Sequence, residues 1–228
     1  MSTLTFTLKS GLRKQLDCRA LTPNLLAGLS VAKISNLNLG THKVSDLFEI
    51  SGDVAKHAND IVTENIVFKN STSLLNYIGY KMSRGSITVE GDAGDFLGAS
   101  LQRGTIICQG NAGDRVGDQM RRGLILIDGN AGDYAASRMI AGTIGIYGKV
   151  GKYIGFNMQR GTILLMKKHK LHATMQDCGT HTLPFLALLF ASFKPLDSLF
   201  NKVKSRRVQR FGGDIACGGN GEILILQP

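Results

Sequence analysis

Tryptophan is absent from this 228-residue sequence, proline and cysteine occur only four times each, and aromatic side chains make up 7% of the residues. The cysteines lie far apart and form no Cys-x-x-Cys pair, which excludes a disulfide framework and a four-cysteine zinc site. No apolar run approaches the roughly 20 residues of a membrane-spanning helix. The first residues also lack the apolar core of a signal peptide. We therefore expect a cytoplasmic protein that does not enter a membrane.

The charge is strongly unbalanced, with 27 lysines and arginines against 17 aspartates and glutamates, a net charge of +10. An excess of this size is typical of proteins that bind nucleic acid, an anionic membrane, an acidic partner or a polyanionic ligand. No nucleic-acid-binding motif is present, and the few aromatic residues offer little for bases to stack on. Nucleic acid is therefore disfavoured as a partner.

Glycine, in contrast, is abundant and recurs with a spacing of 19 residues. An Arg-Gly pair marks each repeat at Arg84, Arg103, Arg122 and Arg160, and Ala141-Gly142 fills the remaining slot. If each repeat forms one coil of a stack, the corners of the coil need a positive φ or a close approach of two backbones, which glycine permits. We therefore predict a structural role for the in-phase glycines Gly91, Gly94, Gly98, Gly110, Gly113, Gly117, Gly129, Gly132, Gly148, Gly151 and Gly155.

Three other positions of the repeat are apolar in every copy, and the residues that occupy one such position are called a column here. The first holds Ile87, Ile106, Ile125, Ile144 and Ile163; the second Val89, Cys108, Ile127, Ile146 and Leu165; the third Met82, Leu101, Met120, Met139 and Met158. The first two columns alternate within a short run, which predicts a strand with one inward face and makes Cys108 a buried thiol. A repeat of 19 residues is too short for helical solenoids and does not match leucine-rich, hexapeptide or nonapeptide repeats. The predicted fold is mainly β, a right-handed parallel β-helix with terminal caps.

The charged columns have two interpretations. Asp95, Asp114 and Asp133 recur once per coil, as do the repeat arginines, and ladders of like charge cost energy unless neutralised. Either the arginines and aspartates pair across coils or extend into water, or an acidic partner or ligand lies along the arginines Arg84, Arg103, Arg122 and Arg160. No catalytic residue is predicted, because a repeated aspartate has no unique environment to shift its pKa.

The flanking segments differ from the repeats and suggest three regions: an N-terminal α/β cap over residues 1–65, the β-helix over 66–168, and a basic extension over 169–228. In the cap we expect an edge strand at Leu4–Leu8, a helix beginning at Pro23, and short strands within 33–39 and 44–48. In the extension we expect an apolar helix over 184–193, packed on the solenoid or on a partner. A closing strand is expected over 223–226.

One group of residues has the spacing of a zinc site: His169, His172, Cys178 and His181. The group lies in a polar segment and is not repeated elsewhere, so no metal site is predicted. The glycine-rich tail lacks the Lys-Ser/Thr of a phosphate-binding loop and is interpreted as tight turns.

The glycine pattern resembles the β-helix domain at the C-terminus of the large polypeptide of glutamate synthase. The longer motif R-G-x-I-x-x-x-G-N-A-G-D-x-x-G at Arg103–Gly117 is similar to the C subunits of formylmethanofuran dehydrogenase and of its bacterial relative, the formyltransferase/hydrolase complex. Three more segments resemble the same family: L-T-P-N-L-L-A-G-L at 21–29, D-L-F-E-I-S-G at 46–52, and F-G-G-D-I-A-C-G-G-N-G-E-I-L at 211–224.

This resemblance implies a non-catalytic subunit that binds no cofactor alone and braces the hydrolase-like A and B subunits and the formyltransferase D subunit. The complex would transfer a formyl group from tetrahydromethanopterin to a methanofuran-like carrier and release formate. The basic composition favours this bacterial complex. The alternative is the tungsten or molybdenum formylmethanofuran dehydrogenase.

The implied carrier bears a chain of γ-linked glutamates, which is a polyanion. A chain of net charge +10 with an arginine column is suited to hold such a polymer, or an acidic partner, by charge-assisted contacts.

Two rival functions are less compatible with the sequence. An amidotransferase needs an N-terminal nucleophilic cysteine, and a carbohydrate-active β-helix needs acids and aromatic residues along one face.

Overall fold

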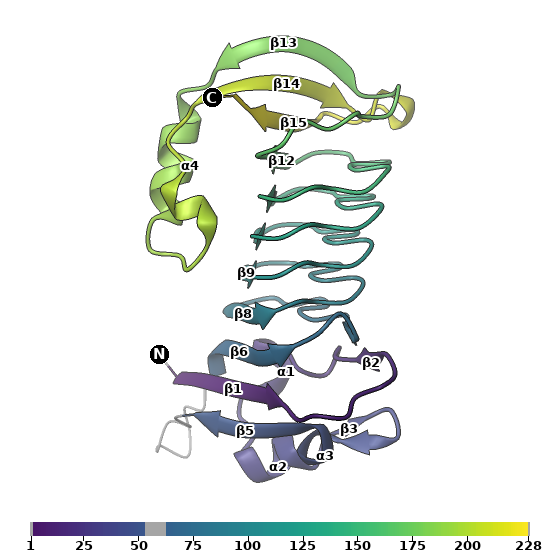
Figure 1. The fold of residues 1–228 in the computed structure, drawn as a ribbon, viewed down its shortest axis with the longest axis vertical. Coiled ribbons are helices and arrows are strands. Elements are labelled where there is room, and N and C mark those ends of the chain that lie inside the picture. The colour runs from purple at the N-terminus through teal and green to yellow at the C-terminus, as the bar shows by residue number, and fades with distance from the viewer. Residues whose placement is uncertain (1, 53–62, 228) are drawn as a thin grey trace.

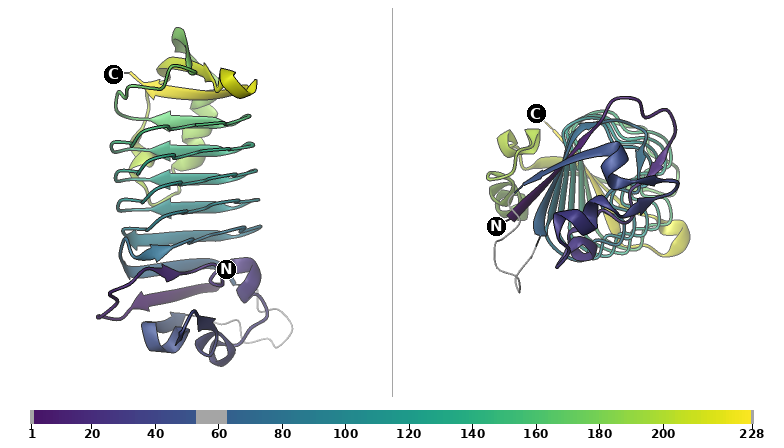
Figure 2. Two further views of the ribbon diagram at one scale, coloured as in Figure 1. Left: turned by 90° about the vertical axis from the view of Figure 1, so that its right-hand side faces the viewer. Right: turned by 90° about the horizontal axis from the view of Figure 1, so that it is seen from below.

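A computed structural model describes residues 2–52 and 63–227, which form a tall stack of similar coils with a group of other elements at each end (Figure 1). The N-terminal elements lie at the lower end of the stack and cover it when the molecule is viewed from below (Figure 2). They are β1 (Ser2–Leu8), β2 (Leu16–Asp17), α1 (Pro23–Leu26), α2 (Val31–Ser35), β3 (Asn38–Leu39), β4 (His42–Lys43), α3 (Val44–Leu47) and β5 (Phe48–Gly52).

The stack and the C-terminal end follow. The strands of the stack are β6 (Thr63–Ser71), β7 (Leu75–Asn76), β8 (Ser86–Gly91), β9 (Thr105–Cys108), β10 (Leu124–Ile127), β11 (Thr143–Ile146) and β12 (Thr162–Leu165). The C-terminal elements are β13 (Gln176–Thr182), α4 (Phe185–Phe193), the 3-10 helix η1 (Leu199–Lys202), β14 (Arg207–Gly213), the 3-10 helix η2 (Ile215–Cys217) and β15 (Gly221–Leu226).

Each 19-residue repeat forms one coil, which pairs in parallel with the same positions of the next coil. Ile106 of β9 lies opposite Ile87 of β8 and Ile125 of β10, so neighbouring strands differ by 19 residues. A second line of parallel bridges joins Ala93, Ala112, Ala131 and Val150 at another side of the coil. The main sheet is mixed and runs in the order β13-β14-β15-β12-β11-β10-β9-β8-β6-β1-β5. The prediction of a mainly β fold is confirmed.

The three apolar columns form the interior of the stack. The five isoleucines from Ile87 to Ile163 are fully buried, as is the column from Met82 to Met158, and the column from Val89 to Leu165 is at most 1% exposed. The flexible methionine side chains fill the interior beside the Arg-Gly turns, and the Met82 methyl group would lie 2.7 Å from a Cβ at Gly104. At the N-terminal end, Phe6, Phe48 and Phe68 pack together, with the Phe6 and Phe68 ring centroids 5.5 Å apart. The predicted inward columns are confirmed.

The N-terminal segment differs from the sequence expectation in two respects. Strand β1 is not an edge strand, because it pairs in parallel with β6 and antiparallel with β5. The regions 33–39 and 44–48 are also partly helical. The Ser30 hydroxyl accepts a hydrogen bond from the Lys33 N–H at the start of α2, and the Asp46 carboxylate accepts one from the Lys43 N–H at the start of α3. Local capping therefore outweighs the strand-like composition.

At the C-terminal end, the expected closing strand exists and is longer than expected. β15 pairs in parallel with β12 as if it were another coil, and Ile223 lies opposite Ile163. Two antiparallel strands, β14 and β13, then follow in the same sheet. The helix expected over 184–193 is α4, and the helix expected to begin at Pro23 is α1.

Within the described parts of the chain, no helix has the length and apolar character needed to cross a bilayer.

Candidate functional site

The arginine ladder, defined as Arg84, Arg103, Arg122 and Arg160, lies just before strands β8, β9, β10 and β12, and these side chains face water. Successive strands of a sheet are about 4.8 Å apart, so the first three arginines stand one coil apart, and Ala141 interrupts the ladder before the fourth. The glycine after each arginine is required by the turn. At Gly104, φ is +108° and a Cβ would lie 2.5 Å from the carbonyl oxygen of Gly85.

The aspartate column, defined as Asp95, Asp114 and Asp133, has a different role from the arginines, because each carboxylate accepts a hydrogen bond from a backbone N–H of the next coil. Asp95 Oδ1 accepts a hydrogen bond from the Asp114 N–H (2.8 Å), and Asp114 Oδ1 accepts one from the Asp133 N–H (2.7 Å). Asp133 in turn accepts from the backbone of Lys152 at 2.7 Å. A Cβ at Gly113 would lie 2.2 Å from Asp95 Oδ1, which explains why a glycine precedes each aspartate.

A second column repeats this arrangement three residues earlier. The side-chain oxygen of Asp92 accepts from the Asn111 N–H at 2.7 Å, Asn111 accepts from the Asn130 N–H at 2.9 Å, and Asn130 accepts from the Lys149 N–H at 2.8 Å. In the next coil, Lys152 occupies the position of the aspartates and Lys149 occupies the position of the second column. These side chains act as acceptors for backbone N–H groups at the turns, and uncharged asparagine serves as well as aspartate.

The sequence left open whether the arginines pair with the aspartates across coils or extend into water, and the structure shows no such pairs among the described residues. Within residues 2–52 and 63–227, the ion pairs are Arg19–Asp17, Lys69–Glu90, Arg138–Asp118 and Arg210–Glu222, and none includes the arginine ladder. The aspartates are engaged with backbone N–H groups on another turn of the coil. The arginine ladder therefore extends into water as a row of positive charge.

Sequence reasoning missed an aromatic column with left-handed backbone. Tyr77, Phe96, Arg115, Tyr134 and Tyr153 follow the 19-residue spacing, and all have φ between 58° and 61°. Non-glycine residues rarely adopt this conformation. Here it turns the N–H toward the next coil, as when the Phe96 N–H donates to the Asp114 carbonyl at 2.8 Å.

The rings of this column stack from coil to coil. The Tyr77 and Phe96 centroids are 4.6 Å apart at 7°, and those of Tyr134 and Tyr153 are 5.0 Å apart. The Arg115 guanidinium lies 4.9 Å from the Tyr134 ring and continues the stack. The same search for 19-residue spacing that found the glycines would have found this column.

The buried carboxylates outside these columns are engaged in structural contacts. Asp118 is 3% exposed and accepts from the Ser137 hydroxyl (2.6 Å) and from Arg138 Nε (3.0 Å), which raises the pKa of Arg138. Asp214 is 2% exposed and accepts from the Asn157 and Ala216 N–H groups. Burial alone would raise the pKa of Asp214, but hydrogen bonds from the Thr174 side chain and these N–H groups lower it below its ordinary value.

The histidines and cysteines do not form a metal site in the described part of the chain, where no three His, Cys, Asp or Glu side chains gather. The His172 ring contacts the Thr174 hydroxyl (2.6 Å) and the Ile154 carbonyl (3.2 Å), and His181 Nε2 lies 2.7 Å from the Cys178 carbonyl. Cys108 is fully buried, as expected, and burial raises its pKa to about 12, which leaves it an unreactive thiol.

Comparison with known proteins identifies the family. A chain in the X-ray crystal structure of the formyltransferase/hydrolase complex FhcABCD from Methylorubrum extorquens, solved in complex with methylofuran, superposes with a TM-score of 0.62 at 30% sequence identity. The match covers 98% of this chain and all of that one. In sequence, the C subunit of the Fhc complex from the same organism is 34% identical over 97 residues, which are 41% of this chain and 34% of the relative. This chain belongs to the family of these C subunits.

The family also includes an archaeal member. The C subunit of the tungsten-containing formylmethanofuran dehydrogenase 2 of Methanocaldococcus jannaschii is 51% identical over 53 residues. The matched segment covers 23% of this chain and 17% of that relative, so both sequence matches span about a third or less of the curated relatives. No family model matches the sequence. The resemblance inferred from the glycine motif is confirmed.

The aspartate column provides a test of how the coils are held together. Replacing Asp114 with Ala removes the acceptor of the Asp133 N–H, and we expect a loss of about 1–2 kcal/mol in the free energy of unfolding. Asp114→Asn keeps an oxygen acceptor and removes one of the stacked charges, so it should remain within roughly 0.5 kcal/mol of the wild type. Urea unfolding followed by circular dichroism measures both. Equal losses in the two variants would contradict the role assigned to the carboxylate oxygen.

Proposed function

We propose that this chain is the non-catalytic scaffold subunit of a formyltransferase/hydrolase complex in one-carbon metabolism. The observation that carries the proposal is the match to a chain of the FhcABCD complex over 98% of this chain and the full length of the other. Under this proposal, partner subunits move a formyl group from tetrahydromethanopterin to a methanofuran-like carrier and release formate. The partners would be the hydrolase-like A and B subunits and the formyltransferase D subunit.

The chemistry of the described residues supports a structural role. Asp118 and Asp214 each accept hydrogen bonds within the fold, and the aspartate column holds neighbouring coils. The outer turns repeat the same side chains at each level, which suits long contact surfaces rather than one active site. We place the complex in the cytoplasm as part of the same proposal.

Two finer aspects of the architecture belong to this proposal. We assign the stack over residues 66–168 to a right-handed parallel β-helix, supported by the in-register parallel pairing of β8 to β12. Residues 1–65 would cap one end, and residues 169–228 would form the basic extension at the other. The burial of Phe6, Phe48 and Phe68 supports a closed N-terminal end.

A second candidate function is that of the C subunit of a tungsten or molybdenum formylmethanofuran dehydrogenase. It is favoured by the 51% identity to the archaeal relative over 53 residues. Both candidates leave the chemistry to other subunits, so the proteins that associate with this chain distinguish them.

Affinity purification of the tagged full-length chain from its native host, followed by mass spectrometry, tests the assignment. We expect formyltransferase and hydrolase subunits in stable proportion, and formate release from formyl-tetrahydromethanopterin by the complex only. Co-purification of tungsten or molybdenum and iron–sulfur subunits would instead establish the second candidate. A solitary chain that is itself active would contradict both.

The arginine ladder is proposed to hold the polyglutamate chain of the carrier or an acidic partner. None of its four side chains pairs with a carboxylate of the described residues. A polyanion lying along the stack would meet one guanidinium per coil over the first three coils, and each contact would be charge-assisted.

Replacing Arg84, Arg103 and Arg122 together with Ala should lower the amount of carrier, or of partner protein, in the complex purified at low salt. The difference from the wild type should shrink as salt is raised, because salt screens the ionic contacts that only the wild type makes. Carrier is measured by mass spectrometry after release. A matched control replaces Arg13, Lys14 and Lys33, three basic residues of the N-terminal segment, with Ala. A triple variant that retains the full carrier load and composition would exclude the ladder as the binding surface.

A further inference from the structure

Residues 183–206, here called the C-terminal arm, leave the stack and lie along its side (Figures 1 and 2). Helix α4 buries Leu186, Phe190 and Phe193 against the outer face of the sheet, where Leu126, Leu164 and Leu224 project from three strands. Phe200 of η1 joins the same cluster, with its ring centroid 6.1 Å from that of Phe193. The arm is therefore packed on the sheet by an apolar interface of its own.

Polar contacts and one glycine fix the position of the arm. Asp128, directly after β10, accepts hydrogen bonds from the Ser198 hydroxyl (2.6 Å) and the Leu199 N–H (2.9 Å). Gln109 donates to Asp197 at 2.8 Å. In β11, a Cβ at Gly145 would lie 2.8 Å from the Phe200 ring, so the glycine makes room for it. The arm is therefore held against three successive coils.

The opposite face of α4 is also apolar but faces water. Phe185 is 43% exposed and Leu188 is 77% exposed, and Ala187 and Ala191 are exposed beside them. A helix with one buried face normally carries polar residues on the other, and a helix that is apolar all round is normally covered on both sides. The exposed face of α4 therefore has the composition of a contact surface.

The charge around this face indicates what covers it. The C-terminal arm contains the basic residues Lys194, Lys202, Lys204 and Arg206 and a single acidic residue. That residue, Asp197, accepts a hydrogen bond from Gln109. Lys194 directly follows α4, and Lys202 and Lys204 line the cavity beside η1. The arm thus combines exposed apolar side chains with positive charge, and a complementary surface is apolar and acidic.

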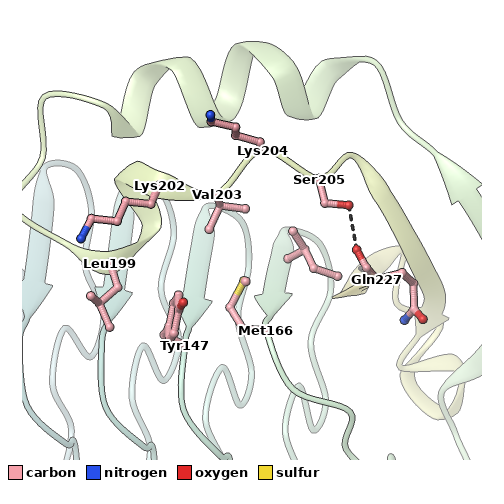
Figure 3. A pocket seen from close by; sticks show the side chains of 9 residues that line it. Tyr147, Met166, Leu199, Lys202, Val203, Lys204, Ser205 and Gln227 are labelled. Atoms are coloured by element: carbon pink, nitrogen blue, oxygen red, sulfur yellow. Dashed lines mark hydrogen bonds between the residues drawn. The ribbon is translucent and has the colours of Figure 1, made fainter.

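A cavity of about 320 Å³ opens beside η1, between the arm and the outer face of the sheet. Figure 3 shows Val203 and Met166 pointing toward one another, with Tyr147 and Leu199 to one side. Lys202 and Lys204 line the same cavity. Its apolar floor and lysine border suit one large apolar side chain next to a carboxylate.

We propose that α4 and this cavity form a docking surface for a partner protein segment that presents apolar side chains flanked by aspartate or glutamate. The surface rests on the proposed function, in which the chain acts by binding other subunits, and specifies where one of them binds. Phe185 and Leu188 supply the apolar contact, the cavity receives one side chain, and Lys202 and Lys204 pair with the acidic flank.

Photo-crosslinking in the intact purified complex tests the surface. A benzoylphenylalanine at position 188 should crosslink to a partner peptide that contains apolar residues next to acidic ones. The matched control is position 25, because Leu25 is 55% exposed on α1 at the other end of the molecule and should not crosslink to that peptide.

Substitutions give an independent measurement. Leu188→Asp, and Lys202→Glu with Lys204→Glu, should each weaken retention of that partner by about tenfold or more, measured by native mass spectrometry across a dilution series. The control Leu25→Asp should leave retention unchanged. Because Leu188 is 77% exposed, its variant should keep the wild-type unfolding midpoint, which separates a binding defect from a folding defect.

Several results would overturn the proposal. One is a complex that assembles normally with Leu188→Asp, and another is a crosslink from position 188 to a second copy of this chain. Binding to vesicles of phosphatidylcholine and phosphatidylglycerol in equal parts that depends on Leu188 would show that the face binds lipid. A wild-type chain that purifies without any partner would contradict the proposed function itself.

Discussion

The whole structure depends on backbone pairing between coils that are offset by 19 residues. Because residue n meets residue n+19 in strands β8 to β12, each kind of side chain is repeated along this part of the stack. Isoleucines and methionines fill the interior, and the turns need acceptors for N–H groups that no strand satisfies. Asp95 and Asn111 supply those acceptors in two parallel columns, which explains why the G-N-A-G-D motif recurs.

The same constraint makes the outer turns uniform, so the distinctive chemistry lies where the repeat is interrupted. Arg115 replaces an aromatic ring in its stack, Asp118 is a buried carboxylate paired with the half-exposed Arg138, and Gly145 opens space for Phe200. The largest interruption is the C-terminal arm, where charge and exposed apolar surface occur together. The arginine ladder and the exposed face of α4, the two binding surfaces proposed here, thus occupy separate places on the stack.

The repeat could be predicted from the sequence because it is local and periodic, and so could the buried columns and the helix α4. Whether the arginine ladder pairs with the aspartates could not be predicted, since equal periodicity does not tell whether two columns lie on the same side of a coil. The Asp128–Ser198 contact joins positions 70 residues apart and has no periodic signal. The aromatic column from Tyr77 to Tyr153 is periodic, but its positive φ is hard to recognise from the sequence, because Tyr, Phe and Arg are not residue types that favour positive φ.

The central claim is that a preformed stack carries separate binding surfaces on its outside. Hydrogen exchange of the isolated chain and of the purified complex, compared peptide by peptide, tests it most directly. The account predicts that strands β8 to β12 are equally protected in both states, with new protection in the complex confined to the C-terminal arm and the turns that bear the arginine ladder. Strands that become protected only in the complex, or an arm that exchanges equally in both, would contradict it.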